Sequence, residues 1–164
     1  MDFVYRLEQS GAMAWVRESG SLLGYPTILF LHTIGLAVVA GLSAGIDLRL
    51  LGFAPRLPLS SLAGAFRFIW AAFWVTALSG TVLLIADAST KLASEVFYVK
   101  MVFVGLAVVN TRLLKTRVFA NPLADSTPVA ASAKLLALSS LALWIATTTA
   151  GRLMAYLGKV SGLD

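Results

Sequence analysis

Apolar and polar positions alternate along this chain in long blocks, and four of the blocks are apolar over almost their whole length. These four blocks cover residues 25–51, 66–86, 97–114 and 135–157. A helix rises about 1.5 Å per residue, so each block can cross an apolar layer of roughly 30 Å. The pattern predicts an all-α fold, an integral membrane four-helix bundle.

The segments between the blocks contain residues that interrupt helices. They read GFAPRLPLSS, DASTKLASE and KTRVFANPLADSTPVAAS, and their prolines and small polar residues are typical of loops. Residues 2–18 precede the first block and place apolar side chains such as Trp15 among charges. This spacing predicts a short interfacial helix that lies on the membrane surface. The length suits one membrane domain over residues 1–164.

Composition identifies lipid as the main solvent of the surface. The chain is 59% hydrophobic and 13% charged, whereas a soluble domain carries about 25% charged residues. The net charge of +5 does not indicate nucleic acid, because the basic residues lie at the ends of apolar blocks and not in one patch. The absence of cysteine excludes disulfides, thiolate metal sites and covalent haem attachment through CxxCH.

The distribution of basic residues predicts the orientation. The face reached by the first and third connections carries Arg49, Arg56, Arg67, Arg112, Lys115, Arg117 and Lys134. Basic residues near the ends of spans mark the cytoplasmic side. We therefore expect a multi-pass protein of the bacterial cytoplasmic (inner) membrane with both termini outside.

Polar residues from all four blocks are expected to gather in the outer third of the bundle. His32, the only histidine, lies about 10 Å below the outer edge at about 1.5 Å per residue. Lys100 opens the third block, Arg152 and Tyr156 end the fourth, and Asp87 ends the second. Ionisable groups inside a membrane cost several kcal/mol, so they indicate function by default.

An imidazole beneath cationic side chains is the arrangement that haem b needs. We expect His32 to ligate the iron through Nε2. Lys100, Arg152 and Tyr156 would then hold the propionates near the surface. A haem bound at this site would give the protein a redox or electron-transfer role.

The sixth iron position cannot be filled by a second histidine of this chain. Met154 and Met101 lie at suitable depths, so His–Met ligation and five-coordinate iron both stay open. A quinone, a porphyrin or a redox protein would be the partner besides the lipid bilayer. Whether the chain is an enzyme stays open, because no set of catalytic groups can be located without the rotations of the helices.

A second interpretation makes the histidine structural. His32 would donate a hydrogen bond to Ser79, to Thr76 or to a backbone carbonyl of a neighbouring helix. Lys100 and Arg152 would extend to the surface or pair with acidic side chains. The protein would then be a non-catalytic membrane subunit or scaffold.

Two sequence elements of the first block are less specific indicators of function. GLSAG sets Gly41 and Gly45 on one helix face, which suits packing in the bundle, a homo-oligomer contact or space for a flat cofactor. DLRLLG can close the first helix, with Asp47 and Arg49 near the cytoplasmic interface. There we expect an ion pair between Asp47 and a basic residue at the end of the third block.

Taken in order, LHTIGLAVVAG, DLRLLG, VFYVKMVFVGLAVVN and AGRLMAY resemble a family of small, uncharacterised bacterial four-helix membrane proteins over nearly the whole chain. The first block and the lysine of a later one are similar, more distantly, to CopD-type copper-resistance domains and to HemJ-type protoporphyrinogen oxidases. HemJ-type proteins bind haem b through a first-helix histidine. That resemblance implies His32 as the ligand and Lys100 as a partner of a porphyrin carboxylate. The single histidine argues against copper transport, which would need several ligands.

Overall fold

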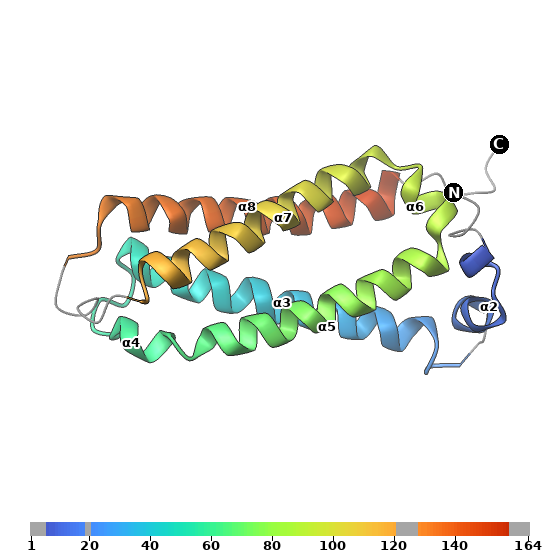
Figure 1. The fold of residues 1–164 in the computed structure, drawn as a ribbon, viewed down its shortest axis with the longest axis horizontal. Coiled ribbons are helices and arrows are strands. Elements are labelled where there is room, and N and C mark those ends of the chain that lie inside the picture. The colour runs from blue at the N-terminus through green and yellow to red at the C-terminus, as the bar shows by residue number, and fades with distance from the viewer. Residues whose placement is uncertain (1–5, 19–20, 121–127, 158–164) are drawn as a thin grey trace.

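Four long helices form the body of the protein (Figure 1). The computed structural model describes residues 6–18, 21–120 and 128–157, and no strand occurs within them. The long helices are α3 (Tyr25–Leu51), α5 (Ala65–Ala86), α7 (Glu95–Arg117) and α8 (Ala131–Leu157). Short helices α2 (Gly11–Glu18), α4 (Leu59–Leu62) and α6 (Ala88–Leu92) lie between or beside them. The all-α class predicted from the sequence is confirmed.

Each long helix is long and apolar enough to cross a membrane, so the chain is a multi-pass membrane protein with four spans. The helices exceed the apolar blocks at some ends. Helix α8 begins at Ala131 and not at residue 135, and α7 ends at Arg117 and not at residue 114. Charged residues such as Lys115 continue a helix readily, so the apolar block marks only the part of the helix that faces lipid.

The helices pack in two pairs, α3 with α5 and α7 with α8, and α3 also packs against α8. We name the two ends of the bundle the α2 end and the α4 end, after the short helices that they carry (Figure 1). Helices α5 and α7 diverge toward the α2 end. The buried core includes Ile46, Leu50, Phe66, Leu114 and Ala137, and it fills mainly the half of the bundle next to the α4 end.

Close packing of α3 on α5 depends on a glycine. A Cβ at Gly35 would collide with Thr76 Oγ1 and would lie 3.1 Å from the carbonyl oxygen of Ala72. Gly41 and Gly45, in contrast, are exposed, and a Cβ at either would meet nothing within 4 Å. It is therefore Gly35, and not the GLSAG pattern, that lets the two backbones approach.

Helix α3 ends at Gly52, as the DLRLLG element predicts. Gly52 has a φ of 108°, a left-handed conformation in which glycine has no Cβ penalty. Its N–H donates to the carbonyl of Arg49 at 3.2 Å, and the N–H of Phe53 donates to that of Leu48 at 3.0 Å. These bonds satisfy carbonyls that the end of a helix leaves open.

The ion pair expected for Asp47 was a wrong prediction. Asp47 has 0% exposed surface, and neither of its carboxylate oxygens has a hydrogen-bond partner. Arg49 instead donates to the carbonyls of Leu57 at 2.5 Å and Pro55 at 3.1 Å. Two residues along a helix turn a side chain by about 200° at 3.6 residues per turn. Asp47 therefore points into the bundle while Arg49 points to the loop that follows α3.

Within the predicted surface helix over residues 2–18, residues 6–8 are helical, a turn interrupts the helix at residues 9–10, and α2 begins at Gly11. Residues 2–5 of that prediction lie outside the described residues. Helix α2 packs against α5, with Val16 buried and Trp15 53% exposed. This division of apolar and amphipathic side chains is typical of a helix at a membrane surface.

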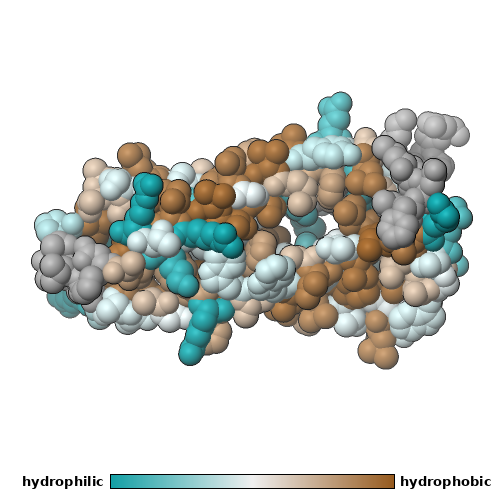
Figure 2. All heavy atoms as spheres, in the orientation of Figure 1, coloured by the Kyte–Doolittle hydropathy of each residue, from teal (hydrophilic) through white to brown (hydrophobic). Residues whose placement is uncertain are grey.

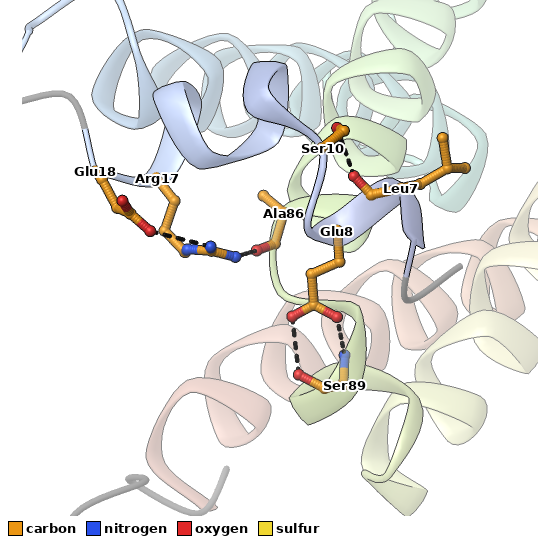
Figure 3. Close-up of polar contacts among 7 residues, drawn as sticks. All are labelled: Leu7, Glu8, Ser10, Arg17, Glu18, Ala86 and Ser89. Carbon is orange, nitrogen blue, oxygen red and sulfur yellow. Dashed lines mark hydrogen bonds and ion pairs between the residues drawn. The ribbon is translucent and has the colours of Figure 1, made fainter. Parts of the chain in front are cut away.

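Polar contacts fix the N-terminal segment to the corner between α5 and α6 (Figure 3). The Glu8 carboxylate accepts from the Ser89 N–H at 3.1 Å and from the Ser89 hydroxyl at 2.9 Å. Arg17 donates to the carbonyl of Ala86 at 3.2 Å and pairs with Glu18 at 3.1 Å. Glu8 thus serves as the acceptor for an open N–H in the first turn of α6, a role that a helix usually gives to its own N-cap side chain.

We expect Glu8→Ala to loosen this segment. Loss of a capping acceptor costs about 0.5–2 kcal/mol, so trypsin cleavage after Arg17 should become about fivefold faster in detergent. The control is Glu95→Ala, which removes an exposed acid at the start of α7 and should leave the cleavage rate unchanged. Equal rates for the two variants would show that the Glu8–Ser89 contact does not hold the segment.

Candidate functional site

A cavity lies between the two helix pairs in the half of the bundle next to the α2 end. Its volume is about 240 Å³, and all four long helices line it. Figure 2 shows an opening in the molecular surface between the α7–α8 pair and the α3–α5 pair. The lining is mostly apolar and includes the aromatic side chains of Phe73, Phe97 and Trp144. A few polar side chains, His32 and Lys100 among them, also reach it.

One ring nitrogen of His32 forms a hydrogen bond to α5, and the other forms none within the described residues. Nδ1 lies 2.9 Å from the carbonyl oxygen of Thr76 on α5. A carbonyl only accepts, so Nδ1 carries a proton, and in the neutral imidazole Nε2 then keeps its lone pair. The hydroxyl of Ser79 lies 3.3 Å from Nδ1 and donates to the carbonyl of Val75 at 2.6 Å. The bond to a neighbouring backbone carbonyl that the structural interpretation predicted is therefore present.

The imidazole packs directly on a glycine of α5. A Cβ at Gly80 would lie 2.8 Å from Cε1 and 3.1 Å from Nδ1 of His32. No ordinary side chain fits there, so Gly80 sets the position of the ring. The sequence prediction missed Gly80, although a lone glycine inside an apolar helix often marks a close approach.

Lys100 reaches the same cavity from α7. Within the part of the chain that the structure describes, it forms no ion pair or hydrogen bond. The acidic side chain of Asp87, which follows α5, pairs with Lys91 at 3.2 Å. On α8, a Cβ at Gly151 would lie 3.7 Å from both Cε and Nζ of Lys100. Gly151 thus leaves room beside the lysine.

Two further polar groups in the cavity wall lack partners. Trp144 Nε1 and Thr147 Oγ1 are buried, and neither has a hydrogen-bond partner. Thr148, by contrast, donates to the carbonyl of Trp144 at 3.0 Å, a local bond that threonines often make within a helix. Buried polar groups in native proteins are nearly always bonded. Both donors are therefore available to a ligand with acceptor atoms.

The other predicted site residues lie apart from the cavity wall. Arg152 is exposed, Tyr156 is 75% exposed, and Met154 is partly buried on α8 outside the lining. Arg152 follows Gly151, and one residue turns a helical side chain by about 100°. Met101, the other candidate for the sixth iron position, does line the cavity. The structure thus brings His32, Lys100 and Met101 together.

The close fit of His32 on Gly80 gives a test of the site's rigidity. We expect Gly80→Ala to lower the free energy of unfolding in detergent by about 1–3 kcal/mol through overpacking. Gly105→Ala is the control, because a Cβ there meets nothing within 4 Å. It should be neutral or slightly stabilising.

A double variant separates this collision from a general effect of the substitution. His32→Ala in the Gly80→Ala background should recover most of the loss, because the colliding ring is gone. An additive double variant would show that the ring is not held against α5.

No protein-family model, no curated protein and no solved structure matches this chain. The chain is therefore described by its architecture, a small membrane protein with four spans, and the likeness to HemJ-type proteins stays a prediction.

Proposed function

We propose that this protein binds haem b in the cavity next to the α2 end, with His32 Nε2 as an axial ligand of the iron. The observation that carries the proposal is the bond from His32 Nδ1–H to the Thr76 carbonyl. Histidines that ligate metals usually donate their other ring N–H to a carbonyl or carboxylate, which fixes the tautomer and the ring. His32 has that arrangement, in an apolar cavity with aromatic walls.

Lys100 gives the cavity an anionic preference. An ammonium group taken out of water without a partner is costly, and a carboxylate of the ligand would offset that cost. In the proposal Lys100 holds one propionate. Arg152 and Tyr156, exposed on the last turns of α8, hold the other at the rim. Met101 or Met154 is the candidate for the sixth position.

The size of the cavity sets a condition on the proposal. Cofactor sites usually have volumes of roughly 300–1,000 Å³, whereas this cavity has about 240 Å³. A tetrapyrrole would therefore need part of its ring to lie in the seam between α5 and α7. These two helices diverge there, and the surface is open (Figure 2).

When bound, the haem would supply one-electron chemistry, and the residues of this chain would hold and orient it. The proposed role is redox or electron transfer, with a quinone, a porphyrin or a redox protein as partner. We place the site on the outer side of the bacterial cytoplasmic membrane. The support is the small excess of arginine and lysine at the α4 end, seven residues with two acids against six with six acids at the other end, the direction expected of a cytoplasmic face.

The absorption spectrum of the purified protein tests this function. We expect a Soret band from haem-replete cells that shifts on reduction with dithionite and is lost in His32→Ala. The control is Thr33→Ala, an exposed neighbour on α3 whose hydroxyl bonds only its own helix. Lys100→Met should keep the His32-dependent band with weaker retention of haem.

A colourless protein that also shows no saturable spectral change on titration with haemin would contradict the proposal. That result would support the second interpretation, in which His32 only forms a hydrogen bond between α3 and α5.

A second candidate function is a non-catalytic membrane subunit or scaffold. It is favoured by the exposed Gly41 and Gly45, which no part of the bundle covers. In this case small residues on a lipid-facing surface would serve contact with another copy.

We expect Gly41→Leu to lower the oligomer size of a self-associating scaffold, measured by light scattering in detergent. Gly105→Leu on α7 is a matched control on another helix face. A monomeric native protein, or the same size for both variants, would contradict a contact through Gly41.

A further inference from the structure

A second group of polar side chains is buried in the half of the bundle next to the α4 end, away from the proposed haem site. Its centre is Asp47 of α3, whose exposed fraction is 0%. Neither carboxylate oxygen has a hydrogen-bond partner. A carboxylate without a partner in an apolar interior is among the most costly arrangements in a protein, and in a membrane it indicates function.

Three hydroxyl groups from three helices line the same small cavity as Asp47. Ser43 lies one turn earlier on α3, Thr111 is on α7, and Ser140 is on α8. All three are buried. The Ser43 and Ser140 hydroxyls have no partner, and Thr111 donates to the Ala107 carbonyl at 2.8 Å, which leaves its oxygen lone pairs free.

The basic residues of this end do not neutralise Asp47. Arg49 binds the two loop carbonyls described above. The Arg67 guanidinium lies 4.6 Å from the ring centroid of Phe68, and that of Arg112 lies 5.4 Å from the ring centroid of Trp70.

The remaining basic side chains at this end within the described ranges are exposed, namely Arg56, Lys115, Arg117 and Lys134. No ion pair joins any of them to Asp47. Among the residues that the structure describes, no counter-charge for Asp47 is in place, which leaves a bound cation or a proton to neutralise it.

We propose that Asp47, Ser43, Thr111 and Ser140 form a binding site for one dehydrated monovalent metal cation of the size of Na⁺. All the donors are oxygen atoms, the ligands that hard cations prefer. The Ser140 hydroxyl lies close enough to the Asp47 carboxylate to interact with it, yet neither serine hydroxyl makes a hydrogen bond of full geometry inside the cavity that they share with the carboxylate. Oxygen atoms from three helices therefore converge on one cavity, as a coordination shell requires.

Charge and size narrow the choice of cation. One carboxylate balances one positive charge, and a divalent ion would leave a net charge in an apolar shell that includes Ile46, Ile69 and Leu114. The cavity has no space for a water molecule, so the ion would bind without its hydration shell. A larger ion such as K⁺ should fit less well. The bound ion would connect α3 with α7 and α8, and so join the two helix pairs.

The test is the thermal stability of the purified full chain in detergent, at constant pH and ionic strength, with NaCl exchanged for choline chloride or KCl. We expect the unfolding midpoint to rise with Na⁺ concentration, because an ion that binds only the folded state stabilises it by mass action. The rise should be smaller in K⁺ and absent in choline.

Variants assign the effect to the site. Asp47→Asn, which keeps the shape and removes the charge, should abolish the Na⁺-dependent shift. Ser140→Ala should raise the half-saturating Na⁺ concentration by about tenfold. The control is Ser79→Ala, which changes a buried serine of α5 beside His32 and should keep the native response to Na⁺.

Two outcomes would overturn the proposal. One is the same midpoint in Na⁺ and choline at every concentration, which means that a proton neutralises Asp47. The other is a Na⁺ response that persists in Asp47→Asn. If that variant does not fold, the half-saturating concentrations of Ser43→Ala and Ser140→Ala decide, and native values in both would equally overturn it.

Discussion

Lipid offers no hydrogen bonds, so each polar group inside this bundle must find its partner in the protein or in something bound to it. That constraint explains the helices themselves, whose backbone groups bond within one segment. It also explains why Gly52 closes α3 with two capping bonds and why Arg49 turns back to loop carbonyls. His32 meets the constraint across helices, through the Thr76 carbonyl.

The groups that fail to meet this constraint are not scattered. Among the described residues, the buried side-chain atoms without partners belong to Ser43, Asp47, Ser140, Trp144 and Thr147. The first three share the small cavity in the half next to the α4 end. The last two line the larger cavity with His32. Since buried polar groups are nearly always bonded in native proteins, this sorting into two places adds support for a ligand in each cavity.

The sequence predicted the parts of this structure that depend on depth in the membrane, and not those that depend on rotation about a helix axis. Apolar blocks gave four helices, and the distances of His32 and Lys100 from the block ends placed both in one layer. Depth alone could not show that Arg152 faces outward while Gly151 faces Lys100.

The same limit explains the error over Asp47, which lies two residues from Arg49 on the other side of α3. Gly80 and Thr147 were missed as site residues because the side chains that they meet come from other helices. The rotation of each helix about its axis is set by close contacts between helices, such as that of Gly35 with Thr76. These helices are apolar on all sides, so their sequences have no narrow apolar stripe that would indicate which side faces the bundle.

The two cavities have opposite chemistry, and this difference limits what each can bind. The cavity next to the α2 end is lined by Lys100, Trp144 and His32 and by threonines such as Thr147. An ammonium group beside an imidazole is the basis on which we proposed an anionic ligand that contains a metal ion. The cavity next to the α4 end presents a carboxylate and hydroxyl oxygens, so it suits a cation. Helices α3 and α8 pack together and contribute to both, so the register between these two helices positions both sites at once.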